Sequence, residues 1–288
     1  MKGLTFAAAF AGAVLVAAAA EAQTPLAHRF TQVAPGVYSA VGNGTIETRS
    51  SNMVIVNGDD VFLVDTNITP EATRRLINDI KTLTDKPVRY VVNTHWHYDH
   101  TDGNQVFGPE VSIIGHANER KEILEGVLKN RIALEFQNLP GQLDNLRKQI
   151  AAETDAAKKK QAEDRLKVQE AYQEQLKETV PTPPNVTFDD HMTVFRGDRE
   201  IRLLYLGRGH SDTDVMVYLP KEKIAAYADM FNLPPADNPV PNPPVVGTQV
   251  FLANLERLNI EPERIMSVHT LNPDRLATKA DITKSLGR

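Results

Sequence analysis

Three histidines and one aspartate fall within six consecutive residues in the first half of the chain. Residues 93–100 read Asn-Thr-His-Trp-His-Tyr-Asp-His, and His95, His97, Asp99 and His100 form an H-x-H-x-D-H pattern. Imidazole nitrogens and carboxylate oxygens are the donors that zinc prefers in proteins. In an extended segment, residues two apart point to the same side, so His95 and His97 can bind one metal ion. The turn that follows would aim Asp99 and His100 at a second ion. The spacing therefore predicts a site for two metal ions.

Four side chains cannot fill two metal sites, so further donors are expected at the ends of other strands. Each of three polar residues follows a predicted strand: His210 after 202–206, Asp229 after 223–227 and His269 after 264–268. We therefore predict seven metal ligands, which are His95, His97, Asp99, His100, His210, Asp229 and His269. Among them, Asp99 is also predicted to be a catalytic residue.

The elements that position these residues alternate between strands and helices. The β-rich runs of the first half are 37–41, 53–56, 61–64, 88–92 and 111–114. Thr69 followed by Pro70 is typical of a helix start, and Leu76 and Ile80 recur on one helical face. The second half adds predicted strands at 202–206, 215–219, 223–227 and 264–268, and predicted helices at 248–258 and 280–286. Such alternation indicates a layered α/β domain.

The segment 117–180 has a different pattern, and we interpret it as an inserted helical hairpin. Apolar residues recur at helical spacing up to Phe136, Pro140-Gly141 is expected to break the helix, and 143–178 reads as a long polar helix with a thin apolar seam. A solvated helix is the usual meaning of such a pattern. A dimer contact, which would make the protein a homo-oligomer, or a lid over the site is the alternative.

The net charge, the N-terminal residues and the absence of cysteine restrict the partners, the location and the ligand chemistry expected of the protein. The 288 residues carry a net charge of −5, and no stretch is basic enough to bind a phosphate backbone, so nucleic acid is excluded as an expected partner. Lys2, the apolar run 4–20 and Ala20-Glu21-Ala22 predict a signal peptide over residues 1–22 and a periplasmic or secreted protein. No other stretch predicts a membrane span. The chain has no cysteine, which excludes disulfides and thiolate ligands.

The H-x-H-x-D-H motif, together with the later His, Asp and His in order, resembles that of the metallo-β-lactamase superfamily. The resemblance covers residues 23–288 except the insertion at about 117–180, and it implies an αββα sandwich with metals at one edge. It also implies Zn²⁺ as the cofactor, two ions per chain, and a metal-bound hydroxide as the nucleophile. By the same resemblance His95, His97 and His210 form the first site, Asp99, His100 and His269 the second, and Asp229 bridges the two.

Within the superfamily, the ligand set narrows the expected activity. The chain lacks the cysteine of the best-known β-lactamase subclasses, and a bridging Asp229 is more typical of the thioesterase, lactonase and nuclease branches. The acidic charge disfavours the nucleases. The expected function is a dinuclear zinc hydrolase acting on a small carbonyl compound, namely a β-lactam, lactone, ester or thioester. The alternatives are a mononuclear iron sulfur dioxygenase and a metal-binding scaffold without turnover.

Other candidate residues are weaker. Asp65 ends the 61–64 strand, either as a strand-end cap or as a carboxylate that orients the metal loop. His116 is expected to be structural, and His28 and His191 have no partner pattern. Trp96 and Tyr98 alternate with the ligands and should point away from them into the core. Tyr227 and a proline-rich loop over 231–246 could flank the pocket.

Overall fold

The computed structural model describes residues 25–229, 248–269 and 276–285. The predicted signal peptide over residues 1–22 and the proline-rich loop over 231–246 lie outside these residues.

A seven-stranded sheet forms one half of the sandwich. Its strands are β1 (His28–Ala34), β2 (Val37–Gly42), β3 (Asn52–Val56), β4 (Val61–Val64), β5 (Val88–Val92), β6 (Ser112–His116) and β7 (Val186–Phe188), in that order across the sheet. Strands β1 to β4 pair antiparallel, and β4 to β7 pair parallel. The parallel pairs require crossover connections, and one of these holds the helix that was predicted after Thr69.

A five-stranded sheet forms the other half. Its strands are β8 (His191–Arg196), β9 (Arg199–Tyr205), β10 (Val215–Leu219), β11 (Ile224–Tyr227) and β12 (Arg264–Ser267), in the order β12-β11-β10-β9-β8. All neighbours pair antiparallel except β11 and β12. Strands β9, β11 and β12 therefore run in the same direction, and their carboxyl ends meet at one edge.

The alternation of apolar side chains produces the layers. Met53 and Ile55 of β3 face the second sheet and meet Val215 and Val217 of β10 in the central core. The intervening Val54 faces outward and packs beneath a helix. Both faces of each sheet are therefore covered.

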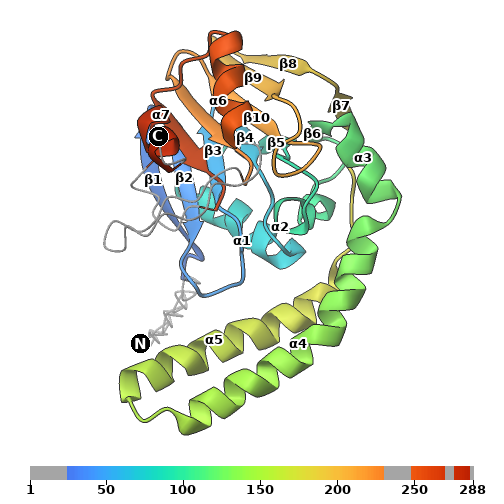
Figure 1. The fold of residues 1–288 in the computed structure, drawn as a ribbon, viewed down its shortest axis with the longest axis vertical. Helices are drawn as coiled ribbons and strands as arrows, with labels where there is room; N and C mark the ends of the chain where they lie inside the picture. The colour runs from blue at the N-terminus through green and yellow to red at the C-terminus, as the bar shows by residue number, and fades with distance from the viewer. Residues whose placement is uncertain (1–24, 230–247, 270–275, 286–288) are drawn as a thin grey trace, which may run out of the picture.

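Three helices cover the outer faces of the sheets. Helix α1 (Pro70–Ile80) begins at Thr69, whose side chain accepts a hydrogen bond from the Ala72 amide, and it buries Leu76 and Ile80 on the first sheet. Helices α6 (Thr248–Arg257) and α7 (Lys279–Ser285) pack on the second sheet through residues such as Phe251 and Ile282. The αββα sandwich predicted from the sequence is confirmed (Figure 1).

The insertion between β6 and β7 is helical, as predicted, but it turns at a different place. Helix α3 (Ala117–Leu124) ends before Gly126, α4 (Val127–Ala152) continues through Pro140, and α5 (Ala156–Gln175) runs back beside α4 (Figure 1). The predicted break at Pro140-Gly141 is wrong. Leu139 and Leu143, on either side of it, are buried against Tyr172, and this packing holds the helix continuous.

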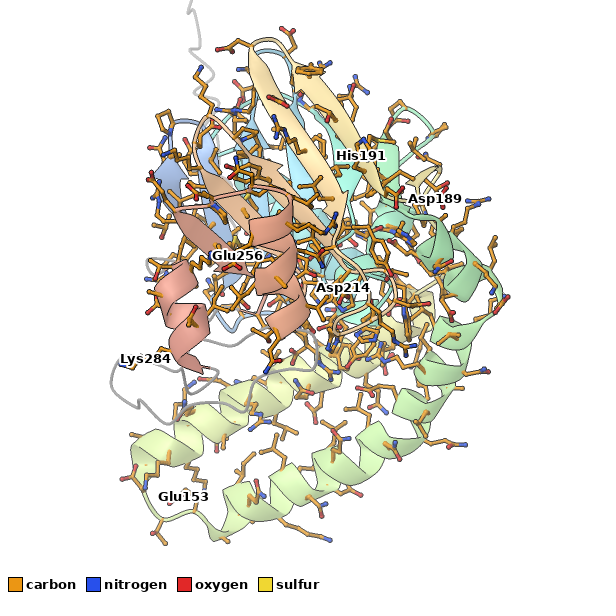
Figure 2. All side chains as sticks on the ribbon, turned by 45° about the horizontal axis from the view of Figure 1, so that its top comes forward. Glu153, Asp189, His191, Asp214, Glu256 and Lys284 are labelled. Carbon is orange, nitrogen blue, oxygen red and sulfur yellow. The ribbon has the colours of Figure 1, made fainter. Side chains whose placement is uncertain are left out.

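The hairpin turn instead lies at residues 153–155. The Asp155 side chain accepts hydrogen bonds from the amides of Ala157 and Lys158 and so starts α5. Figure 2 shows Glu153 at the tip of the hairpin, away from the sandwich. None of the helices in the described ranges has the length and apolarity needed to cross a membrane.

Candidate metal centre

The H-x-H-x-D-H segment follows β5 and is bent by its own hydrogen bonds. Asn93 donates from Nδ2 to the carbonyl oxygen of His100 (3.0 Å) and accepts from Asn104 Nδ2 (2.9 Å). These bonds fold the loop back on itself, and Asp99 and His100 fall in the one-turn helix α2 (Tyr98–Thr101). The carbonyl of Thr94 accepts from the Val215 amide at the start of β10 (2.7 Å). The loop is thereby fixed at the edge where β9 ends.

The other candidate ligands reach the same edge from the second sheet. His210 lies between β9 and β10, Asp229 lies two residues after β11, and His269 lies two residues after β12. Because these strands end on one side, their following residues converge on the bent loop. The structure brings all seven predicted ligands together, in two groups: His95, His97, His210 and Asp229, and Asp99, His100 and His269.

In the first group, three imidazole nitrogens point at one another. His97 Nδ1 lies 3.0 Å from His95 Nε2 and 2.9 Å from His210 Nε2. Burial, with the neighbouring histidines adding to it, lowers the pKa of His95 well below its usual range. Burial and His210 lower the pKa of His97 to about 4. These two rings are therefore neutral at physiological pH and offer lone pairs rather than charges.

The second group mixes charges. Asp99 Oδ2 lies 3.5 Å from His100 Nε2 and 3.4 Å from His269 Nε2. Burial opposes ionisation of Asp99, but His100 and His269 outweigh it and hold its pKa well below the usual range. For His100, burial would lower the pKa, but Asp99, Asp65 and Asp229 outweigh it and raise the pKa. The pKa of His269 is also raised, against burial, by its hydrogen bond to Asp229.

The carboxylate of Asp229 faces both groups. Its Oδ2 lies 2.8 Å from His269 Nε2 and 3.4 Å from His210 Nε2, and its Oδ1 lies 3.5 Å from His100 Nε2. Histidines of the two groups therefore lie around one carboxylate.

Two buried polar atoms without partners in the described part of the chain indicate that metal ions fit among these residues. His100 Nε2 and Asp229 Oδ1 are buried and have no hydrogen-bond partner among the described residues, although they face each other. Ligand atoms bound to zinc at about 2.0–2.2 Å lie roughly 3–3.5 Å apart when the geometry is tetrahedral. The donor atoms of each group lie within 4.8 Å of one another, and several pairs fall in that narrower range. The residues fit divalent cations, which would satisfy both orphaned atoms.

Asp65 orients the second group from beneath. Its carboxylate accepts hydrogen bonds from the Thr94 amide (2.7 Å), from Thr94 Oγ1 (3.0 Å) and from His100 Nδ1 (2.8 Å). When His100 is deprotonated, a donating Nδ1 leaves its lone pair on Nε2, toward Asp229 and Asp99. Of the two interpretations of Asp65, the structure favours the carboxylate that orients the metal loop.

Sequence reasoning missed the loop between β2 and β3. The carbonyl of Arg49 accepts a hydrogen bond from His269 Nδ1 (2.9 Å), and Ser50 Oγ donates to the carbonyl of Asp99 (2.5 Å). Both contacts join residues far apart in the sequence, and no local pattern signals them.

Trp96 does not point away from the ligands as predicted. Its ring stands edge to face against the ring of His97, with 4.3 Å between centroids. The prediction assumed an extended strand, whereas this segment is bent, so strand alternation does not apply. Tyr98 does pack away from the site, against the cluster formed by Leu139, Leu143 and neighbouring apolar residues.

The remaining histidines, which are His28, His116 and His191, do not belong to either donor group. His116 ends β6 and caps α3, with Nδ1 accepting from the Asn118 amide and Nε2 donating to the Asp189 carbonyl. His28 Nδ1 lies 3.0 Å from Asp79 Oδ2 on α1. His191 is exposed on β8. Tyr227 is buried and stacks on Phe251 beneath the outer helix rather than lining the site.

The protein is therefore an α/β sandwich of two sheets, with two groups of candidate metal ligands at one edge. A family model for the metallo-β-lactamase superfamily matches residues 46–250, more than half of the chain. The chain belongs to the metallo-β-lactamase superfamily of metal-dependent hydrolases.

Solved structures share the fold at low sequence identity. A metallo-β-lactamase from Pontibacter korlensis matches with a TM-score of 0.60 and 18% identity, over 90% of this chain and 97% of that one. The mono-zinc form of FIM-1 from Pseudomonas aeruginosa matches with a TM-score of 0.57 and 15% identity, over 90% and 93%. A metallo-β-lactamase from Erythrobacter litoralis matches with a TM-score of 0.54 and 19% identity, over 91% and 95%. At this identity the likeness establishes the fold.

Proposed function

We propose that the protein is a dinuclear zinc hydrolase acting on a small carbonyl substrate, namely a β-lactam, lactone, ester or thioester. The observation that carries the proposal is the placement of Asp229 between two donor groups, each of which offers three further donors. His95, His97 and His210 would hold one ion, Asp99, His100 and His269 the other, and Asp229 would contact both.

When bound, the zinc ions would supply Lewis acidity and a water molecule of lowered pKa. The chain's own residues supply the rest. Neutral His95 and His97 present lone pairs that need no deprotonation, which favours occupation of the first group. Asp65 fixes the ring of His100, and the Arg49 carbonyl fixes the ring of His269. Preorganised donors of this kind lower the cost of reorganisation during the reaction.

Asp99 is the residue that we propose to act in catalysis beyond binding metal. Its low pKa keeps the carboxylate ionised, so Oδ2 can accept a hydrogen bond and cannot donate one. From its place beside His100 and His269 it can orient the proton of the attacking water.

The open side of the centre sets the direction of substrate approach. The side chains of His210 and His269 are 26% and 25% exposed, whereas those of His95 and His100 are fully buried. A substrate carbonyl would therefore approach past the partly exposed histidines, which also include His97 on the loop after β5.

Metal analysis joined to a substrate screen tests the function. Protein purified without added metal should contain two zinc ions per chain and hydrolyse at least one of the four carbonyl classes. One iron per chain, with oxygen consumed in the presence of a thiol substrate, would replace the hydrolase by the sulfur dioxygenase alternative. Two bound zinc ions without turnover of any class would favour the scaffold.

We also propose export, on the strength of the basic, apolar and Ala-Glu-Ala pattern of residues 1–22. N-terminal sequencing of the exported protein should begin at Gln23. A mature protein that still starts at Met1 and stays in the cytoplasm would contradict export.

A further inference from the structure

One face of α4 contacts two loops next to the second donor group. Arg131 and Glu135 lie one helical turn apart, so both face the same side. Arg131 Nη1 lies 3.3 Å from Asp102 Oδ2, and its guanidinium lies on the ring of Tyr98. Glu135 Oε1 accepts a hydrogen bond from Arg49 Nη2 (3.0 Å). The insertion therefore reaches both the H-x-H-x-D-H loop and the loop between β2 and β3.

Arg49 has an unusual backbone that its side chain anchors. Its φ is 55°, in the left-handed region that residues other than glycine and asparagine seldom adopt. Such a conformation persists only where the surroundings hold it in place. The guanidinium is held by Glu135 and lies 5.0 Å from the ring centre of Tyr172, whose hydroxyl in turn donates to Glu135 (3.2 Å). These holding contacts come from the insertion, and their side chains are mostly buried.

The strained residue fixes a ligand of the second group. The Arg49 carbonyl can only accept, so His269 Nδ1 must carry the proton in their 2.9 Å hydrogen bond. With no metal bound, Nε2 also carries a proton, which it donates to Asp229 Oδ2 (2.8 Å); a metal ion that displaces this proton would find the lone pair on Nε2, beside Asp99 and Asp229. The next residue, Ser50, donates to the carbonyl of Asp99. The orientation of this short loop thus sets two of the three donors of the second group.

We propose that the helical insertion positions the second metal-binding group, with Glu135 acting through Arg49 on His269. The inference rests on the proposed dinuclear function and assigns the insertion a role in it. Without Glu135 the Arg49 side chain loses its shortest ion pair and keeps the longer contacts to Glu47 (3.8 Å) and to the ring of Tyr172 (5.0 Å). The backbone of Arg49 then relaxes toward ordinary φ and its carbonyl turns away from His269. His269 loses the hydrogen bond that orients its ring, and the second ion binds more weakly.

The hairpin provides a matched control. Glu170 on α5 forms an ion pair with Arg147 on α4, with 2.8 Å between Glu170 Oε1 and Arg147 Nη2. Like Glu135 and Arg49, these two residues pair a glutamate with an arginine. This pair is exposed on the hairpin and contacts neither loop of the metal centre. Glu170→Ala therefore removes the same chemistry from the same insertion without touching Arg49.

Zinc binding to the full chain, measured by competition with a chromophoric chelator, separates the two ions. Glu135→Ala and Arg49→Ala should weaken the second zinc by about 10- to 100-fold and leave the first within about twofold, the range usual for residues that orient a ligand. Glu170→Ala should leave both within about twofold. Arg49→Asn should lose less than Arg49→Ala, because asparagine adopts the left-handed backbone more readily. Glu135→Gln provides a milder variant should Glu135→Ala not fold.

The Nδ1 proton of His269 gives a second readout that needs no metal. NMR of the metal-free protein should show this proton hydrogen-bonded and slow to exchange with solvent in the wild type and in Glu170→Ala, and fast to exchange in Glu135→Ala or Glu135→Gln. Folded Glu135 and Arg49 variants with wild-type zinc affinities and an unchanged His269 would overturn the proposal. A wild type that binds one zinc ion would instead refute the dinuclear function, and the exchange of the His269 Nδ1 proton alone would then decide whether Glu135 positions His269.

Discussion

At the scale of single residues, the two donor groups differ in how they hold protons. Burial keeps His95 and His97 neutral, with the pKa of His97 lowered to about 4. Carboxylates around His100 and His269 raise the pKa of both rings in spite of burial. A metal ion binds only the deprotonated ring, so it must displace protons from the second group and not from His95 or His97.

This difference predicts that the second ion is the more sensitive to acid. A raised pKa means that His100 and His269 hold protons at pH values where free histidine has lost them. Protons compete with the metal ion for these two rings, and lowering the pH strengthens that competition. Between about pH 8 and pH 6, affinity for the second zinc should fall by up to tenfold per pH unit for each proton displaced, and affinity for the first should fall less steeply. Chelator competition at several pH values measures both slopes. Equal slopes for the two ions would contradict the assignment of protons.

His100→Ala tests the second group directly. The ring contributes Nε2, which is buried and unpartnered among the described residues. The variant should keep about one metal ion per chain and lose at least about 100-fold in hydrolysis. Metal content and turnover are measured on the same preparation. Both zinc ions retained at wild-type turnover would show that His100 is not a ligand.

At the scale of elements, the sequence predicts those whose pattern is local. Strands β3, β4, β5 and β10 are short apolar runs, and each lies where it was predicted. Strand β8 was missed because its alternation is weak, with Phe195 65% exposed on the outer side. The seven predicted ligands converge because they follow strands that end at one edge. Arg49 and Glu135 could not be predicted, because their roles depend on contacts between residues 86 positions apart.

Pro140 is where local preference and packing disagree. Proline removes one backbone hydrogen bond and crowds the preceding turn, yet burial of Leu139 and Leu143 keeps α4 continuous. Pro140 itself is exposed, so Pro140→Ala removes no buried contact. The substitution should raise the free energy of unfolding by about 1–3 kcal/mol. The gain is reduced in part because proline also restricts the unfolded chain, and alanine does not.

Thermal unfolding of Pro140→Ala checks the gain, with zinc affinity measured in parallel. Gly141→Ala, one residue further along the same helix, should give a smaller gain of at most about 1 kcal/mol. An unchanged or lower midpoint for Pro140→Ala would mean that the packing of Leu139 needs the bend that proline imposes.

At the scale of the whole molecule, the hairpin has a base and a tip with different surroundings. The base holds Glu135, Leu139, Leu143 and Tyr172, which pack against the sandwich. No residue of 152–165 is buried, and the tip stands away from both sheets (Figure 2). The proposed positioning of His269 therefore belongs to the base, and the tip makes no contribution to it.

Replacing residues 152–165 with a short glycine linker separates these roles. Arg147 and Glu170 lie side by side across the two helices, so a few residues suffice to reconnect α4 to α5. The shortened protein should bind zinc with wild-type affinity at both groups, because every contact to the Arg49 loop is retained. If the tip holds two copies of the chain together, light scattering should show a fall to the monomer mass. Weakened binding of the second zinc by the shortened chain would mean that the tip, and not only the base with Glu135, supports the metal centre.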